Sequence, residues 1–159
     1  MRVPARERPL STAAMASRHA ATKVRVGDDD AMTDRVAVTD WVARYERAWR
    51  SPGTDALDEL FTETVSYAPS PWAHPVVGIE SLRRFWDAAR NGPDEGFQMG
   101  SEVVAIDGQV AVVRVVVHYD DGQRWRDLWV LAFDEQERCA HFEEWPFASN
   151  QPDGHEGDR

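Results

Sequence analysis

Residues 97–147 decide the fold of this chain, and they read FQMGSEVVAIDGQVAVVRVVVHYDDGQRWRDLWVLAFDEQERCAHFEEWPF. Apolar and polar residues alternate through much of this stretch, and a period of two residues is typical of β-strands. Asp107-Gly108 and Asp120-Asp121-Gly122 interrupt the alternation where hairpin turns are expected. We therefore expect an antiparallel meander. The pattern places its strands at about residues 97–106, 109–119, 124–134 and 138–147.

The strand expected at about residues 109–119 has two largely apolar faces. Every second residue from Ala111 to Tyr119 is apolar, and the intervening set places Arg114 and His118 among valines. Such a strand is covered on both sides. The helices expected upstream can cover one face only. We therefore expect a homodimer in which the outer sheet face of each copy is covered by the other.

Apolar residues at helical spacing precede the strands. They run from Trp41 to Trp49 after Thr39-Asp40, which we expect to cap a helix. We expect Thr54 to cap a second helix whose buried stripe includes Phe61, and Asn91-Gly92-Pro93 to end a third. Helices followed by a run of antiparallel strands predict the α+β class.

Composition argues against several classes of protein. The net charge of −10 repels phosphate backbones, so we expect no nucleic-acid partner. No apolar run approaches the roughly 20 residues that span a bilayer, so we expect no membrane partner. A single cysteine, Cys139, provides no disulfide framework, which fits a cytoplasmic location. The histidines lack the spacing of a zinc site and there is no glycine-rich phosphate-binding motif, so we expect neither metal nor cofactor.

The two ends of the chain differ in composition from its middle. Residues 1–31 are rich in Ala, Arg, Ser and Thr and show no apolar period. We expect them to be a disordered extension or an over-extended gene start, with Met32 as the true initiator. The expected domain spans residues 32–148, and the polar residues 149–159 form an expected flexible tail.

A series of motifs runs along the body of the chain. It comprises WVARYERAW at 41–49, DALDELF at 55–61, GIESLRRFW at 78–86, RDLWVLAFD at 126–134 and FEEWPF at 142–147. This order resembles the nuclear transport factor 2-like superfamily and, within it, SnoaL-like domains. The resemblance covers about residues 36–148. It implies a cone-shaped half-barrel, in which N-terminal helices pack on a curved, mainly antiparallel sheet around a ligand cavity, and it commonly implies dimerisation.

The resemblance also implies which side chains face that cavity. They are Arg114, His118, Asp127, Trp129 and Glu144. Tyr45 takes the position of the tyrosine that donates to the oxyanion in steroid isomerases. Ala68 and Trp129 occupy the positions of their base and their protonated acid, so isomerisation by that mechanism is not expected. Compared with limonene-type epoxide hydrolases, Arg114 resembles their strand arginine and Glu144 their final-strand aspartate, while Val116 replaces the remaining acid.

An arginine beside two carboxylates in an apolar cone predicts acid–base chemistry, because such acids have their ionisation pushed apart. In this interpretation Asp127 or Glu144 moves a proton, Arg114 fixes the carboxylate and Tyr45 donates a hydrogen bond. The alternative interpretation is a buried structural network without a substrate.

Seven tryptophans predict an aromatic pocket for a small hydrophobic or carbonyl-bearing ligand. The sequence leaves two kinds of function open. One is an enzyme, a cyclase, isomerase, dehydratase or hydrolase acting on a small apolar metabolite. The other is a non-catalytic ligand-binding or dimerisation module. The expected ligand contacts are Trp49, Trp72, His74, Trp86, Met99, His118 and Trp129, with Trp125 as a further wall.

Overall fold

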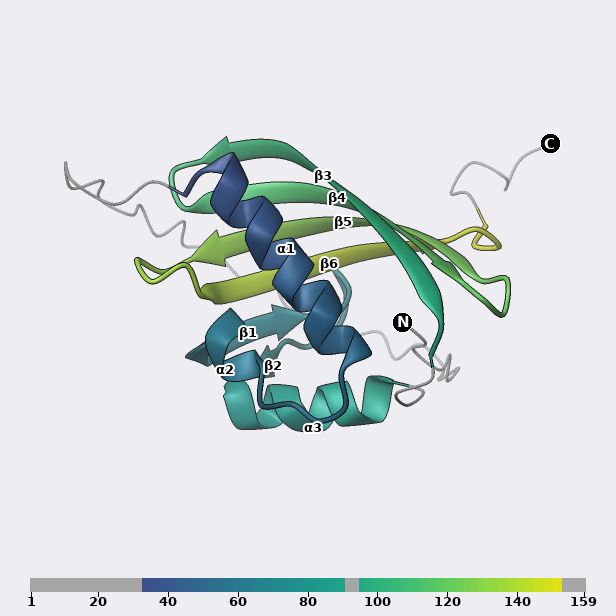
Figure 1. Ribbon diagram of the computed structural model, residues 1–159, viewed down its shortest axis with the longest axis horizontal. Coiled ribbons are helices and arrows are strands. Elements are labelled where there is room, and N and C mark those ends of the chain that lie inside the picture. Colours follow the sequence, from purple (N-terminus) through teal and green to yellow (C-terminus); the bar gives the residue numbers. More distant parts are fainter. Residues whose placement is uncertain (1–32, 91–94, 153–159) are drawn as a thin grey trace, which may run out of the picture.

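The computed structural model describes residues 33–90 and 95–152, which form three helices and six strands (Figure 1). The expected start at Met32 and residues 153–159 of the expected tail lie outside the described residues. In chain order the elements are α1 (Arg35–Arg50), α2 (Leu57–Leu60), β1 (Phe61–Ala68), β2 (Val76–Val77), α3 (Ile79–Ala89), β3 (Phe97–Asp107), β4 (Val110–Tyr119), β5 (Arg124–Phe133) and β6 (Cys139–Ala148).

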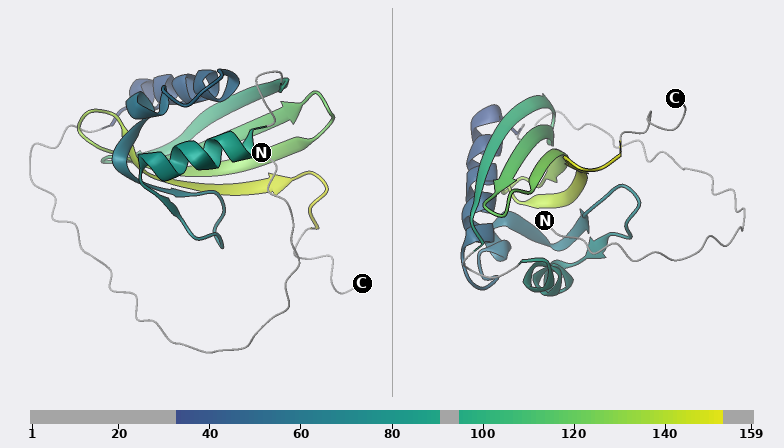
Figure 2. Two further views of the ribbon diagram at one scale, coloured as in Figure 1. Left: turned by 90° about the horizontal axis from the view of Figure 1, so that it is seen from below. Right: turned by 90° about the vertical axis from the view of Figure 1, so that its right-hand side faces the viewer.

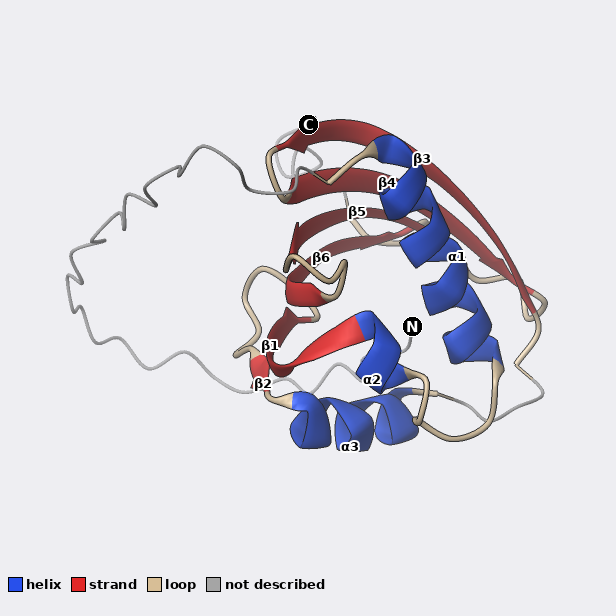
Figure 3. Ribbon diagram, turned by 60° about the vertical axis from the view of Figure 1, so that its left-hand side comes forward, coloured by secondary structure: helices blue, strands red, loops and turns tan. Residues whose placement is uncertain are grey.

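The strands form one sheet in the order β2-β1-β6-β5-β4-β3. Neighbouring strands are antiparallel except β1 and β6, which run parallel. The helix α1 crosses one face of the sheet (Figure 1), and α3 lies beside β1 and β2 (Figure 3). The sheet curves around this side without closing (Figure 2). The predicted α+β half-barrel is confirmed, and the meander strands lie close to their expected bounds.

The helix α1 begins earlier than the sequence pattern predicts. Its cap is Asp34, whose side-chain oxygen accepts a hydrogen bond from the backbone N–H of Ala37 over 2.8 Å. The predicted cap at Thr39-Asp40 is wrong, because Val38 is fully buried and already belongs to the apolar face of the helix.

The segment between α1 and α3 also differs from the prediction. The helix α2 is a single turn without a side-chain cap, so Thr54 is not the predicted cap; its backbone oxygen accepts the N–H of Leu57 in a turn. Phe61 is buried as expected but begins β1 instead of lying in a helix. The two-residue strand β2 was not predicted. The expected helix stop at Asn91-Gly92-Pro93 lies outside the described residues.

Aromatic side chains fill the space between α1 and the sheet. The Tyr45 ring centroid lies 4.8 Å from that of Trp129 and 5.1 Å from that of Trp86, and Trp41 lies 5.5 Å from Phe133. Each such pair contributes about 0.5–1.5 kcal/mol beyond the area it buries. This packing holds Tyr45 on the helix against Trp129 on the sheet.

The strand β4 has one buried face and one outer face. Val113 and Val115 are fully buried, whereas Arg114 and His118 are exposed on the opposite side. The register pairs Val115 with Asp127 on β5, so the buried residues of β4 share the inner face of the sheet with Asp127.

Candidate functional site

A small cavity lies between α1 and the inner face of the sheet. The space in it open to the centre of a water molecule is about 30 Å³, which is room for a water or two. Its wall is mostly aromatic, and Asp127 and Glu144 contribute its two carboxyl groups. The lining residues are Tyr45, Trp49, Phe97, Met99, Val117, Tyr119, Trp125, Asp127, Trp129 and Glu144.

Strand geometry brings the two carboxyl groups together. Asp127 and Trp129 are two residues apart on β5 and therefore point to the same face. Glu144 on β6 is paired directly with Trp129, which makes Glu144 a diagonal neighbour of Asp127. The indole Nε1 of Trp129 donates to Glu144 Oε1 over 3.2 Å. Asp127 is 7% exposed and Glu144 is 1% exposed, so water screens this pair poorly.

Burial shifts the ionisation of both acids. It raises the pKa of Asp127 to about 6, although hydrogen bonds from Glu144 and from the backbone N–H of Phe147 oppose the rise. Burial, and after it the charge of Asp127, raises the pKa of Glu144 to about 8, against the donation from Trp129. Near pH 7 the pair therefore holds one proton, with Glu144 as the acid and Asp127 as the carboxylate.

Each acid keeps one oxygen without a hydrogen-bond partner among the described residues, namely Asp127 Oδ1 and Glu144 Oε2. The indole Nε1 of Trp125 is likewise buried without a partner in the part of the chain that the structure describes. All three residues line the cavity. Leaving a buried polar group unsatisfied costs about 1–3 kcal/mol. The cavity thus offers a donor, a base and an acid to a polar atom placed inside it.

A tyrosine pair forms the back of the site. The hydroxyl groups of Tyr45 and Tyr67 lie 3.1 Å apart, and both side chains are buried. Burial raises the pKa of both tyrosines well above the ordinary value, so both hydroxyls stay protonated at neutral pH. When Tyr67 donates to Tyr45, the Tyr45 O–H is left to donate elsewhere.

Two predicted cavity residues lie on the other side of the sheet. Arg114 points outward and pairs with Glu102 over 2.6 Å, with 57% of its side chain exposed. His118 is exposed on the same outer face. The prediction that Arg114 and His118 face Asp127 and Glu144 is wrong, because a shift of one residue moves every side chain of a strand to the opposite face.

The predicted ligand contacts divide into two groups. The structure places Trp49, Met99 and Trp129 in the cavity wall, together with Trp125. Trp86 is fully buried behind Trp49, with 4.7 Å between the ring centroids, and does not line the cavity. Trp72 is 97% exposed and His74 is exposed; both lie in the loop after β1 and neither lines the cavity.

The sequence reasoning missed Phe97, Val117 and Tyr119 as cavity residues. The signal for the last two was present, because they belong to the wholly apolar set of β4. In the described residues no group of three His, Cys, Asp or Glu side chains is placed to hold a metal ion. None of the helices described is both long and apolar enough to cross a membrane.

Solved structures share this fold. The epoxide hydrolase/cyclase-like enzyme SalBIII, which has a role in pyran ring formation in salinomycin, is 16% identical with a TM-score of 0.58, covering 72% of this chain and 93% of its own. A proposed polyketide cyclase from Sinorhizobium meliloti is 22% identical with a TM-score of 0.54, covering 68% and 97%. A proposed ketosteroid isomerase from Kribbella flavida is 19% identical with a TM-score of 0.55, covering 79% and 87%. At these identities the likeness shows the fold alone.

The comparison with family models assigns the family. No curated protein matches the chain at a significant level. A model described as a SnoaL-like domain matches residues 42–142, which include α1, the acid pair and nearly all of the sheet. The chain belongs to the SnoaL-like domain family.

Proposed function

We propose that the chain is an acid–base catalyst for a small, apolar, carbonyl-bearing metabolite, with Asp127 as the base and Glu144 as the acid. One observation carries the proposal: unpartnered polar atoms of Asp127, Glu144 and Trp125 converge on a cavity that is otherwise apolar. A ligand oxygen placed there satisfies donors that the described protein leaves unpaired.

The chemistry follows from the single proton of the pair. Asp127 takes a proton from the carbon beside the ligand carbonyl, while Glu144 gives its proton to the carbonyl oxygen, and an enol forms. The enol proton then returns to Glu144. Asp127 returns its proton either to a different carbon, which completes an isomerisation, or to a second carbonyl oxygen of the same ligand as a new C–C bond closes a ring. Both routes restore the starting pair.

The wall of the cavity indicates how a ligand enters. The present space holds little more than water. Met99, Tyr119 and Trp125 are the partly exposed wall residues, whereas Trp49 and Trp129 are buried. We infer that a ligand enters by displacing the partly exposed side chains, at the end of β3, β4 and β5 where they lie.

The test uses 2-tetralone, a small apolar ketone, as a probe. Incubated in D2O with the protein, it is expected to exchange the hydrogens beside its carbonyl for deuterium, followed by mass spectrometry. Asp127→Asn is expected to lower the exchange rate by about 100-fold or more, and Glu144→Gln to lower it as well. Arg114→Gln is the matched control, because Arg114 lies on the outer face. Folded Asp127→Asn that exchanges as fast as the control would rule out the acid–base role and leave a non-catalytic binding site.

We also propose a homodimer through the outer sheet face. Exposed apolar side chains from neighbouring strands support it, because patches of this kind mark protein interfaces. They are Val104 on β3, Val110 on β4, Leu128 on β5 and Trp145 on β6, each between 37% and 43% exposed.

A further inference from the structure

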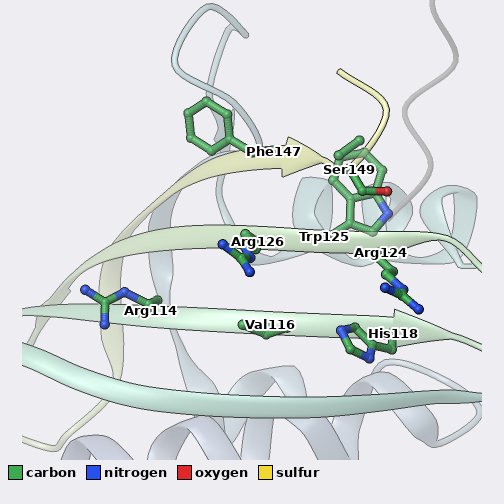
Figure 4. A pocket seen from close by; sticks show the side chains of 9 residues that line it. Arg114, Val116, His118, Arg124, Trp125, Arg126, Phe147 and Ser149 are labelled. Atoms are coloured by element: carbon green, nitrogen blue, oxygen red, sulfur yellow. The ribbon is translucent and has the colours of Figure 1, made fainter. Parts of the chain in front are cut away.

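A groove of about 800 Å³ lies on the outer face of the sheet, across β4, β5 and the end of β6 (Figure 4). Arg114, Val116 and His118 follow one another along β4, and Arg124 and Arg126 lie along β5 (Figure 4). Phe147 on β6 forms a further wall. The groove is at the end of the sheet away from Val110, and it is separated from the cavity by the sheet itself.

The groove concentrates positive charge on an acidic protein. The register sets His118 directly opposite Arg124 and places Arg126 two residues further along the same face. Cationic side chains this close together destabilise a sheet. The chain as a whole carries a net charge of −10, so acidic partners are abundant in the sequence.

Most of these cations are not neutralised. Arg114 pairs with Glu102 over 2.6 Å. By contrast, the structure gives Arg124 and Arg126 no side-chain hydrogen bond and no ion pair with any residue in 33–90 or 95–152. Two guanidinium groups held side by side with free donors match a carboxylate or phosphate.

Apolar surface adjoins the unpaired arginines. Phe147 is paired with Arg126 across β5 and β6 and is 52% exposed. Val116 lies opposite Arg126 on the other side and is partly buried. Exposed aromatic surface beside a charge suits a ligand with an apolar body and an anionic end.

We propose that this groove is a second ligand site, which binds a small organic anion with an aliphatic body and a carboxylate head. Arg124 and Arg126 hold the carboxylate, and Phe147 and Val116 contact the aliphatic chain. The two sites select opposite charges, because the carboxylate of Asp127 repels an anion from the cavity while the arginines attract it to the groove. The anion site stands on its own residues and does not depend on the catalytic role of Asp127.

Isothermal titration calorimetry with octanoate tests the proposal. The wild-type chain is expected to bind octanoate, and the double variant Arg124→Gln/Arg126→Gln to bind it at least about tenfold more weakly, since each hydrogen bond to a charged group is worth about 1.5–3 kcal/mol. Arg47→Gln is the matched control: Arg47 is exposed on α1, and the change removes one positive charge outside the groove. The control is expected to bind like the wild type.

Further ligands separate the alternatives. Octanol and inorganic phosphate are expected to bind more weakly than octanoate, because each has only half of the required chemistry. Absence of octanoate binding, or binding that the double variant leaves unchanged, would overturn the proposal. Equal binding of inorganic phosphate would reject the apolar half of the site. Tighter binding of a hexaglutamate peptide would assign the groove to an acidic protein partner instead. The thermal midpoint should rise with octanoate in the wild type and not in the double variant, which excludes a folding defect as the cause.

Discussion

Trp129 and Glu144 lie directly opposite each other on β5 and β6, and the Trp129 indole donates to Glu144 Oε1 over 3.2 Å. This bond anchors one oxygen of a fully buried carboxyl group. The other oxygen, Glu144 Oε2, has no hydrogen-bond partner among the described residues and belongs to a residue that lines the cavity. The pairing thus orients the acid that the proposed reaction needs.

Trp129→Phe is expected to destabilise the protein more at pH 9 than at pH 6. The indole donation favours the ionised form of Glu144, because it lowers the pKa of that group. Removing it therefore penalises the charged carboxylate most. Urea unfolding at the two pH values measures the difference.

Trp145→Phe provides the matched control for this substitution. Trp145 donates to Glu143 Oε1 over 2.6 Å, but that pair is exposed on the outer face. Its loss should cost about 1 kcal/mol or less and show little pH dependence. An equal pH dependence in both variants would contradict the assigned environment of Glu144.

Stability should fall as the pH rises from about 6 to about 8. The folded pKa of Glu144, about 8, lies above its value of 4.5 in the unfolded chain. The unfolded state therefore releases its proton first, and the stability present below pH 4.5 is lost as the pH rises toward 8. The slope is up to about 1.4 kcal/mol per pH unit for one group. Asp127, with a folded pKa of about 6, adds to the loss at lower pH.

Glu144→Gln is expected to remove most of this slope between about pH 6 and pH 8, because the amide does not ionise. Glu102→Gln changes an exposed carboxylate on the outer face and should leave the slope in place. Urea unfolding across this range measures both variants. Stability that rises between pH 6 and pH 8 in the wild type would be incompatible with a buried, protonated Glu144.

The tyrosine pair separates a structural from a catalytic contribution. Tyr45 lines the cavity, whereas Tyr67 lies behind it and contacts the Tyr45 hydroxyl. Both Tyr45→Phe and Tyr67→Phe break this hydrogen bond and should cost about 1 kcal/mol each. Only Tyr45→Phe should also slow deuterium exchange into 2-tetralone. Equal exchange rates in the two variants would show that Tyr45 does not donate to the ligand.

Leu128→Glu is expected to convert the proposed dimer into a monomer. Leu128 is 37% exposed at the centre of the outer face, paired with Arg114 on one side and Trp145 on the other. A buried carboxylate there lacks a partner across the interface. Sedimentation velocity of the wild type and the variant gives the two masses. Val36→Glu, at a 69% exposed position on α1, serves as the control; a monomeric wild type would contradict the proposal.

The strand region illustrates what alternation in a sequence can predict. The run from Phe97 to Phe147 gave the meander, because hairpin turns and a period of two depend on local residues alone. The faces of β4 were also readable, since its wholly apolar set, such as Val113 and Val115, is the buried one. The expectation for Arg114 came instead from likeness to relatives, and a one-residue slip in such a comparison reverses the face.

The remaining differences arise from tertiary structure. The pairing of β1 with β6 is parallel and joins residues far apart in the chain, so no local pattern reports it. The unpartnered indole of Trp125 and the packing of Trp86 behind Trp49 depend on how α1 and α3 meet the sheet. Strand parity did place Asp127 and Glu144 on the inner face, which is why the acid pair was accessible from the sequence.

The central claim is that Asp127 and Glu144 share one proton at neutral pH inside the cavity. Carbon-13 NMR of the side-chain carboxyl groups, titrated from pH 4 to pH 10 and assigned with Asp127→Asn and Glu144→Gln, tests it most directly. We predict two titration steps, near pH 6 for Asp127 and near pH 8 for Glu144, in a protein that stays folded throughout. Complete ionisation of both carboxyl groups below about pH 5, as in ordinary exposed acids, would contradict the account.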